Sequence, residues 1–188
     1  VFKYFEEICS IPHGSNNVKQ ISDYLVDFAK AHNLKCRQDD DLNVIIWKDG
    51  SKGYEDSEPV ILQGHMDMVA VQEADCKKDM EKEGLDLEIN GDFISAKGTS
   101  LGGDDGIAVA YTLAVLDDEE MAHPPVEAIF TVNEEIGMLG AASIDVSDLK
   151  GRLFMNMDSE DEGVFTVSCA GGASVICKIP YKRDLVNA

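Results

Sequence analysis

The sequence predicts an α/β protein, a three-layer α/β/α sandwich with a mixed, largely parallel sheet. Apolar runs with strand character alternate with segments of helical periodicity, which is the pattern of a sheet covered by helices. Several of these runs end in acidic or imidazole side chains, and ligands collect at the carboxyl ends of strands in such sheets. The 188 residues, of which 44% are hydrophobic, are enough for one domain with an apolar core.

The first part of the chain is predicted to contain two helices. A short helix is expected over residues 2–9, before a Pro-His-Gly sequence that interrupts it. In residues 17–32, apolar side chains recur at spacings of three and four and mark one face of an amphipathic helix. Ser15 or Asn16 can cap the start of this helix, and Asn33 suits the left-handed position after its end.

Most of the later elements are predicted to be strands. The runs with strand character are residues 43–47, 60–63, 91–96, 126–132, 152–157, 164–169 and 173–179. The alanine-rich apolar run 107–116 is long enough for a buried helix, although its periodicity alone does not exclude a strand. Residues 73–88 are charged and have no clear periodicity, which predicts a surface loop.

The charge of the chain excludes several classes of partner. The formal net charge is -20, and so acidic a surface repels nucleic acids and anionic membranes. No apolar run approaches the length of a membrane span, and the first residues lack the pattern of a signal peptide. The five cysteines are odd in number and include no CxxC pair, which indicates reduced thiols. We therefore expect a cytoplasmic protein that binds neither nucleic acid nor membranes.

Acidic and imidazole side chains follow the ends of several apolar runs or lie in a glycine-flanked turn. These side chains are His65, Asp67, Asp104, Glu134, Glu135 and Asp158. Taken singly, each has an ordinary explanation as a polar turn, a solvated strand end or an acidic loop. Together, one imidazole and several carboxylates at strand ends are what a two-metal hydrolytic site requires. A calcium-binding loop fits less well, because no acidic run has the DxDxDG spacing.

The spacing of these residues suggests separate roles. If the strand continues through His65, the carboxylate of Asp67 lies on the same face and can accept the ring N–H. Asp104 lies among glycines, which let its carboxylate approach and bridge two cations. A phosphate loop fits poorly here, because no GK[ST] sequence follows the glycines. Of the adjacent Glu134 and Glu135, one can bind metal while the other acts as general base.

Five stretches of the sequence form a specific combination, although each one alone is common. They are LQGHMDMV at 62–69, AKGTSLGGDDG at 96–106, EEIGM at 134–138, NMDSE at 156–160 and CAGG at 169–172. In this order they resemble the aminoacyl-histidine dipeptidases, a carnosinase-like group of Xaa-His dipeptidases. That group is part of a superfamily of dizinc aminopeptidases, carboxypeptidases and aminoacylases. The resemblance covers essentially the whole chain and implies an incomplete zinc-peptidase fold.

The resemblance implies which residues hold the metal ions. His65 and Asp158 would bind one zinc ion. Asp104 would bridge that ion to a second one, which Glu135 would also bind. Zinc is the implied metal, and cobalt or manganese also suits a carboxylate-rich site with one or two imidazoles.

The remaining site residues receive roles in the same way. The resemblance implies that Glu134 is the general base and that Asp67 orients the ring of His65. It also implies a cis peptide bond between Asp104 and Asp105, a geometry that is costly without proline. Asp105 departs from the asparagine that relatives often have at this position, which adds charge beside the bridging carboxylate.

The implied reaction is metal-dependent hydrolysis of the peptide bond in Xaa-His dipeptides. Two alternatives stay open at this point. One is an aminoacylase, tripeptidase or carboxypeptidase of the same superfamily, which would use the same site on another substrate. The other is a catalytically silent metal-binding or scaffold fragment. Assays with a panel of substrates would distinguish a dipeptidase from the other enzymes of the superfamily. Measurements of zinc content and activity would distinguish an enzyme from a silent fragment.

The resemblance also predicts how the chain is organised. Enzymes of this group are longer, with an inserted lid domain and a later histidine ligand that nothing after residues 169–172 supplies. Residues 1–170 would be the N-terminal part of the catalytic metallopeptidase domain. Residues 171–188 would be the start of the lid domain or a truncated tail. We therefore expect the isolated chain to be inactive, and we expect any homodimer to form through the missing lid.

Overall fold

The computed structural model describes the chain as two units. The described residues are 1–159, 163–168, 171–173 and 175–182. The units are Val1–Asp158 and Ser159–Ala188. Each helix and strand of the described residues lies in the first unit.

The second unit has neither helix nor strand in its described residues. The strands predicted over 164–169 and 173–179 are therefore wrong for the described part of both ranges. Three residues of the sequence motifs, Glu160, Cys169 and Ala170, lie outside the described residues.

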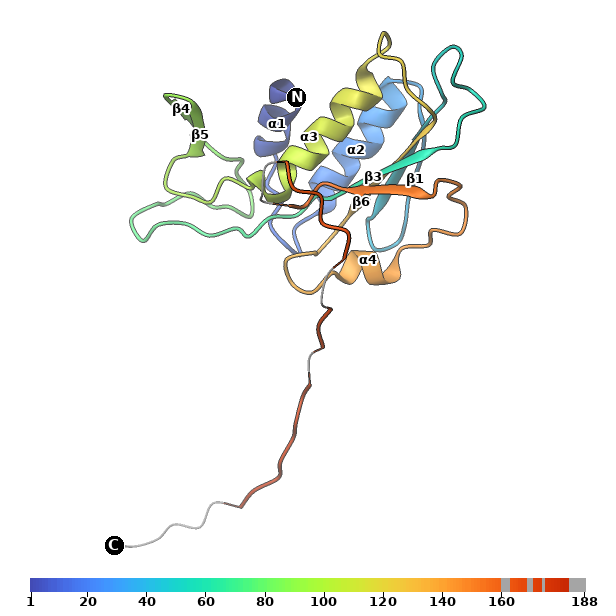
Figure 1. Ribbon diagram of the computed structural model, residues 1–188. Coiled ribbons are helices and arrows are strands. Elements are labelled where there is room, and N and C mark those ends of the chain that lie inside the picture. Colours follow the sequence, from blue (N-terminus) through green and yellow to red (C-terminus); the bar gives the residue numbers. More distant parts are fainter. Residues whose placement is uncertain (160–162, 169–170, 174, 183–188) are drawn as a thin grey trace, which may run out of the picture. The chain divides into compact units, whose positions relative to one another are not determined.

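The first unit combines a five-stranded sheet, a two-stranded hairpin and four helices. Its elements are α1 (Phe2–Cys9), α2 (Lys19–Ala31), β1 (Lys35–Gln38), β2 (Val44–Lys48), β3 (Val60–His65), β4 (Leu87–Asn90), β5 (Phe93–Ala96), α3 (Gly103–Asp117), β6 (Val126–Thr131), α4 (Leu139–Ser143) and β7 (Leu153–Asn156). The strand order of the sheet is β1-β2-β6-β3-β7, and β4 pairs with β5. Figure 1 shows α1, α2 and α3 on one side of the sheet and the short α4 on the other.

The sheet is mixed and largely parallel, as the sequence predicted. β3 pairs in parallel with both β6 and β7. β2 is antiparallel to both of its neighbours, β1 and β6. Within this sheet, β2 is therefore the one strand that runs against the other four. The predicted three-layer α/β/α class is confirmed, with α4 as a small second helical layer.

The apolar core lies between the sheet and the three helices on its first side. The amphipathic face of α2 contributes Ile21 and Leu25, and both side chains are fully buried. They pack in one cluster with Leu113 of α3, Ile46 of β2 and Phe130 of β6. The amphipathic and buried helices predicted over 17–32 and 107–116 are thus confirmed as α2 and part of α3. None of the helices in the described chain is long and apolar enough to cross a membrane.

Several local features differ from the sequence prediction. The strands β1 and β4 and the helix α4 were not predicted. β4 includes the last two residues of the range 73–88, which was predicted to be a loop. The glycine-flanked turn around Asp104 falls at the start of α3, whose range begins at Gly103, but Asp104 and Asp105 have non-helical backbone angles there. These elements are short or polar, so their hydrophobic pattern was too weak to reveal them.

The two ends of α2 show one wrong prediction and one confirmed prediction. Neither Ser15 nor Asn16 caps the start of α2, because the cap position is Val18 and no side chain bonds there. The hydroxyl of Ser15 instead bonds to Asp67. At the other end, Asn33 has a φ of 56°, so it adopts the predicted left-handed conformation.

Candidate metal centre

Three parallel strands end at one edge of the sheet and bring the predicted site residues together. His65 is the last residue of β3 and lies opposite Thr131, the last residue of β6. Gln63 of β3 pairs with Asn156, the last residue of β7. The segments that follow β6 and β7 therefore leave the sheet beside His65, and they contain Glu134, Glu135 and Asp158. The start of α3 supplies Asp104 to the same edge.

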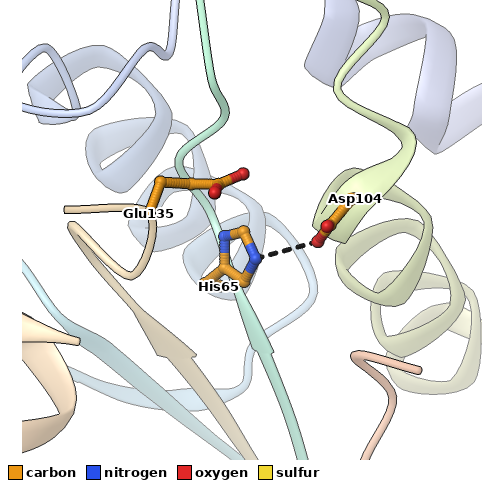
Figure 2. A group of neighbouring side chains, drawn as sticks. All are labelled: His65, Asp104 and Glu135. Atoms are coloured by element: carbon orange, nitrogen blue, oxygen red, sulfur yellow. Dashed lines mark hydrogen bonds and ion pairs between the residues drawn. The ribbon is translucent and has the colours of Figure 1, made fainter. Parts of the chain in front are cut away.

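The imidazole of His65 is the centre of the cluster. It is buried, with an exposed fraction of 1%. Its Nε2 lies 3.1 Å from Oδ1 of Asp104 and 3.8 Å from Oε2 of Glu134. Figure 2 shows the side chains of Asp104 and Glu135 directed toward the imidazole. The ring thus faces carboxylates from two different segments of the chain.

Two groups of possible ligands share this imidazole. One group is His65, Asp104 and Glu135, and the other is His65, Glu134 and Asp158. In each group, one donor atom per residue lies within 4.8 Å of the others. The structure therefore brings all five residues together, although they come from four separate segments. It groups Glu134 with Asp158, whereas the resemblance implies that Glu134 is the general base.

The sixth predicted residue, Asp67, lies beneath the cluster with an exposed fraction of 1%. The Nδ1 atom of His65 is 2.9 Å from the backbone oxygen of Asp67 and 3.6 Å from its carboxylate Oδ1. That carboxylate oxygen accepts a hydrogen bond of 3.0 Å from the backbone N–H of Glu134. The other carboxylate oxygen accepts one of 2.8 Å from the hydroxyl of Ser15. Asp67 therefore contacts both the imidazole and the segment of the two glutamates.

Asp105 is a buried part of the site that the sequence did not identify as functional. Its exposed fraction is 1%, and its Oδ2 accepts a 3.1 Å hydrogen bond from the backbone N–H of His65. The peptide bond between Asp104 and Asp105 is cis, as predicted. A Cβ atom at Gly64 would lie 2.8 Å from Oδ2 of Asp105. The glycine before His65 is therefore required for this close approach.

The local charges shift several pKa values at the site. Burial acts to lower the pKa of His65, but the nearby Asp67 and Asp105 outweigh it and raise this pKa to about 9. Burial raises the pKa of Asp105 to about 7. Burial and neighbouring carboxylates also raise the pKa values of Glu134 and Glu135. The site therefore collects negative charge that is costly without a compensating cation.

This donor set suits a divalent metal ion. Carboxylate oxygens and an imidazole nitrogen are the usual ligands of zinc, cobalt and manganese in hydrolytic sites. Burial is the main cause of the raised pKa values of Glu134 and Glu135, and repulsion from neighbouring carboxylates adds to it; a bound cation would counter both effects. The residues present therefore fit a metal centre, and the five donors allow more than one ion.

Two further hydrogen bonds hold segments that flank the site, and neither was predicted from the sequence. Ser15 bonds to the carboxylate of Asp67, and Asn133 accepts a hydrogen bond from the backbone of Asn16. The loop before α2 is more than one hundred residues away from Asn133 in the chain. No short-range pattern could have revealed these contacts, since they depend on the packing of distant segments.

Comparison with known proteins shows which proteins the chain is similar to. No protein-family model matches it. It is 39% identical to the cytosol non-specific dipeptidase of Escherichia coli (strain K12) over 184 residues, which cover 98% of this chain and 38% of that protein. The crystal structure of aminoacylhistidine dipeptidase from Vibrio alginolyticus matches with a TM-score of 0.83 and 40% identity, over 86% of this chain and 33% of that chain.

A second solved structure supports the fold alone. The crystal structure of a tripeptidase from Staphylococcus aureus has a TM-score of 0.71 and 22% identity, over 85% of this chain and 43% of that chain. This chain spans 38% of the length of the curated dipeptidase that it matches. The resemblance predicted from the sequence motifs is confirmed: this chain is related to the aminoacylhistidine and cytosol dipeptidases.

Proposed function

We propose that the protein hydrolyses the peptide bond of dipeptides and requires two divalent metal ions. The observation that carries this proposal is the convergence of one imidazole and four carboxylates, in a chain that is 39% identical to a dipeptidase. In this proposal the ligands of the ions are His65, Asp104, Glu135 and Asp158. Zinc is the expected metal, with cobalt or manganese as substitutes. When bound, such ions polarise the scissile carbonyl and make water a better nucleophile.

Glu134 is the general base in this mechanism. Its carboxylate removes a proton from the attacking water and later donates that proton to the leaving amine. Burial raises its pKa above the usual value, which makes its carboxylate a stronger base toward the attacking water. Its side chain retains 30% exposure, so water and substrate can reach it. Asp67 fixes the backbone of Glu134 and the ring of His65 in the same mechanism.

The proposed substrates are dipeptides of the Xaa-His type, and a broader range is the main alternative. The Vibrio relative is named for aminoacylhistidine and the Escherichia coli relative is named non-specific. An aminoacylase, tripeptidase or carboxypeptidase would use the same donor set. Activity of the complete gene product on a panel of Xaa-His dipeptides, other dipeptides, tripeptides and acylated amino acids decides between them.

Substitution of the proposed base tests the mechanism. In the complete product of the gene, Glu134→Gln should abolish turnover while the metal content stays at the wild-type level. Glu58→Gln is the matched control, because Glu58 is an exposed glutamate outside the cluster. Turnover at the wild-type rate in Glu134→Gln would show that another group acts as base.

The isolated chain is proposed to bind metal without being an active peptidase. Support comes from its length, since it spans 38% of the related dipeptidase. In this proposal residues 1–170 are part of a catalytic domain, residues 171–188 begin a lid or tail, and a homodimer forms through the lid. Metal content and peptidase activity of this 188-residue chain test the proposal directly. Turnover comparable with that of the complete gene product would contradict it.

A cytosolic location is part of the same proposal. It is supported by the name of the Escherichia coli relative, which is a cytosol dipeptidase. In the described part of the chain, Cys9, Cys36, Cys76 and Cys177 are free thiols, in keeping with reducing conditions. Fractionation of cells that produce the protein is the direct measurement.

A further inference from the structure

The loop before α2 packs along the segment that follows β3. The backbone N–H of Met68 donates a hydrogen bond of 3.1 Å to the carbonyl of His13, and Met68 accepts one of 3.2 Å from Ser15. Gly14 forms a parallel bridge with Met68. A Cβ atom at Gly14 would lie 2.8 Å from the Cβ atom of Ala70, so glycine permits this close packing. The loop is therefore held in place by backbone contacts that do not involve the hydroxyl of Ser15.

The hydroxyl of Ser15 extends this packing into the site. It donates a hydrogen bond of 2.8 Å to Oδ2 of Asp67. The other oxygen of Asp67 accepts the backbone N–H of Glu134 at 3.0 Å. Because Asp67 is almost completely buried, water does not compete for these oxygens. The position of the Glu134 backbone thus depends on a carboxylate that Ser15 holds from its other side.

A second contact joins the same two segments. The backbone N–H of Asn16 donates a hydrogen bond of 2.7 Å to Oδ1 of Asn133. Asn16 and Asn133 both have positive φ values, 66° and 55°, which asparagine tolerates better than most residues. Asn16 is therefore bonded directly to Asn133, and Ser15 is connected to Glu134 through Asp67.

We propose that Ser15 is a positioning residue for the general base: through Asp67, it fixes the backbone of Glu134 beside the metal ligands. This inference rests on the proposed function, since it assigns Glu134 the role of base. Ser15 contacts neither substrate nor metal in this role. It acts by keeping the carboxylate of Asp67 in one orientation, so that the backbone N–H of Glu134 always donates to the same oxygen.

Loss of the hydroxyl should have a specific effect. In Ser15→Ala, Asp67 loses one of its two fixed partners and can rotate, which loosens its bond to the Glu134 amide. The rate of hydrogen exchange at that amide should rise about fivefold, as expected for the loss of one hydrogen bond. Ser15→Thr keeps a hydroxyl, so its exchange rate should stay within about twofold of the wild-type rate.

The turnover number should follow the same order as the exchange rates, with a larger effect in Ser15→Ala than in Ser15→Thr. A small displacement of a catalytic group lowers the rate of the chemical step more than the binding of substrate. In the complete gene product, Ser15→Ala should lower kcat about tenfold with KM and metal content unchanged. Ser15→Thr should recover most of kcat. A loop with a merely structural role would lower stability in both variants without this split between kcat and KM.

The experiment measures amide exchange at Glu134 in the 188-residue chain, and kcat, KM and metal content in the complete gene product. Ser10→Ala is the matched control, because its exposed hydroxyl bonds to the carbonyl of Glu7 away from the site. Wild-type exchange at Glu134 in Ser15→Ala would overturn the inference, as would a kcat equal to that of Ser10→Ala. Absence of peptidase activity in the wild-type product would contradict the proposed function, whereas the exchange measurement would still test whether Ser15 positions this segment.

Discussion

The side chain of Asp105 accepts a hydrogen bond of 3.1 Å from the backbone N–H of His65. This contact joins the non-helical start of α3 to the last residue of β3. It places a buried carboxylate next to His65, although Asp105 belongs to neither group of possible metal ligands. Burial raises the pKa of Asp105 to about 7, whereas its usual value is 3.8. The ionised form is therefore costly in the folded chain without metal.

Replacement of this carboxylate by an amide should stabilise the metal-free chain at high pH. A raised pKa means that the wild-type chain loses stability as the pH rises from about 4 to about 7, and that the loss is complete above this range. Asp105→Asn removes that loss and keeps an oxygen that can accept the N–H of His65. The gain should be on the order of 2 kcal/mol at pH 8 and near zero at pH 3.5. Urea unfolding in the presence of a chelator, at several pH values, measures this gain in stability. An equal gain at pH 3.5 and pH 8 would contradict the pKa argument.

The close approach of Gly64 to Asp105 predicts a steric effect. In Gly64→Ala, the new Cβ would lie 2.8 Å from Oδ2 of Asp105 and 2.9 Å from Cβ of Ala108. We expect a loss of about 1–3 kcal/mol in the free energy of unfolding and weaker zinc binding, because His65 must shift. Gly103→Ala is the control for stability, since a Cβ there meets no atom within 4 Å. Equal stability of Gly64→Ala and Gly103→Ala would contradict this steric prediction.

Metal binding should release protons from the site. The pKa of His65 is raised to about 9 in the chain without metal, so its ring is protonated at pH 7.5. A metal ion binds only the deprotonated nitrogen, so binding at pH 7.5 should release about one proton from His65. The raised pKa values of Glu134 and Glu135 would add to this release at lower pH. Zinc titration calorimetry in buffers with different ionisation enthalpies measures the number of protons, which should fall as the pH passes 9.

A buried glutamate outside the metal cluster should be important for stability. The carboxylate of Glu127 in β6 accepts hydrogen bonds of 2.9–3.0 Å from the backbone N–H groups of Lys150 and Gly151. It thereby holds the loop that leads into β7, the strand before Asp158. Glu127→Gln leaves one oxygen to accept from both N–H groups and turns its own N–H donor toward the N–H of Lys150, which should lower the free energy of unfolding by about 2 kcal/mol. Glu58→Gln at the surface is the control, and equal unfolding midpoints would contradict this assignment.

Local patterns in the sequence were sufficient for the elements that are long and periodic. The helix α2 repeats apolar residues every three or four positions, so its buried face could be identified before its partners were known. The apolar runs of β3 and β6 likewise matched buried strands of the parallel sheet. By contrast, β1 is a polar edge strand defined by its pairing with β2. The apolar runs beyond residue 163 have strand propensity, but their described residues form no ladder.

The sequence by itself predicted which residues could bind metal, because imidazole and carboxylate groups follow several apolar runs and lie in motifs that resemble those of the dipeptidases. Only the tertiary structure decided how they are supported. Ser15 had the pattern of a helix cap, yet its hydroxyl bonds to Asp67. Asp105 was noted only as a departure from relatives, yet it is buried against the backbone of His65. A hydrogen bond between segments 40 or more residues apart depends on how the sheet and loops pack, and a local pattern of residues does not encode that packing.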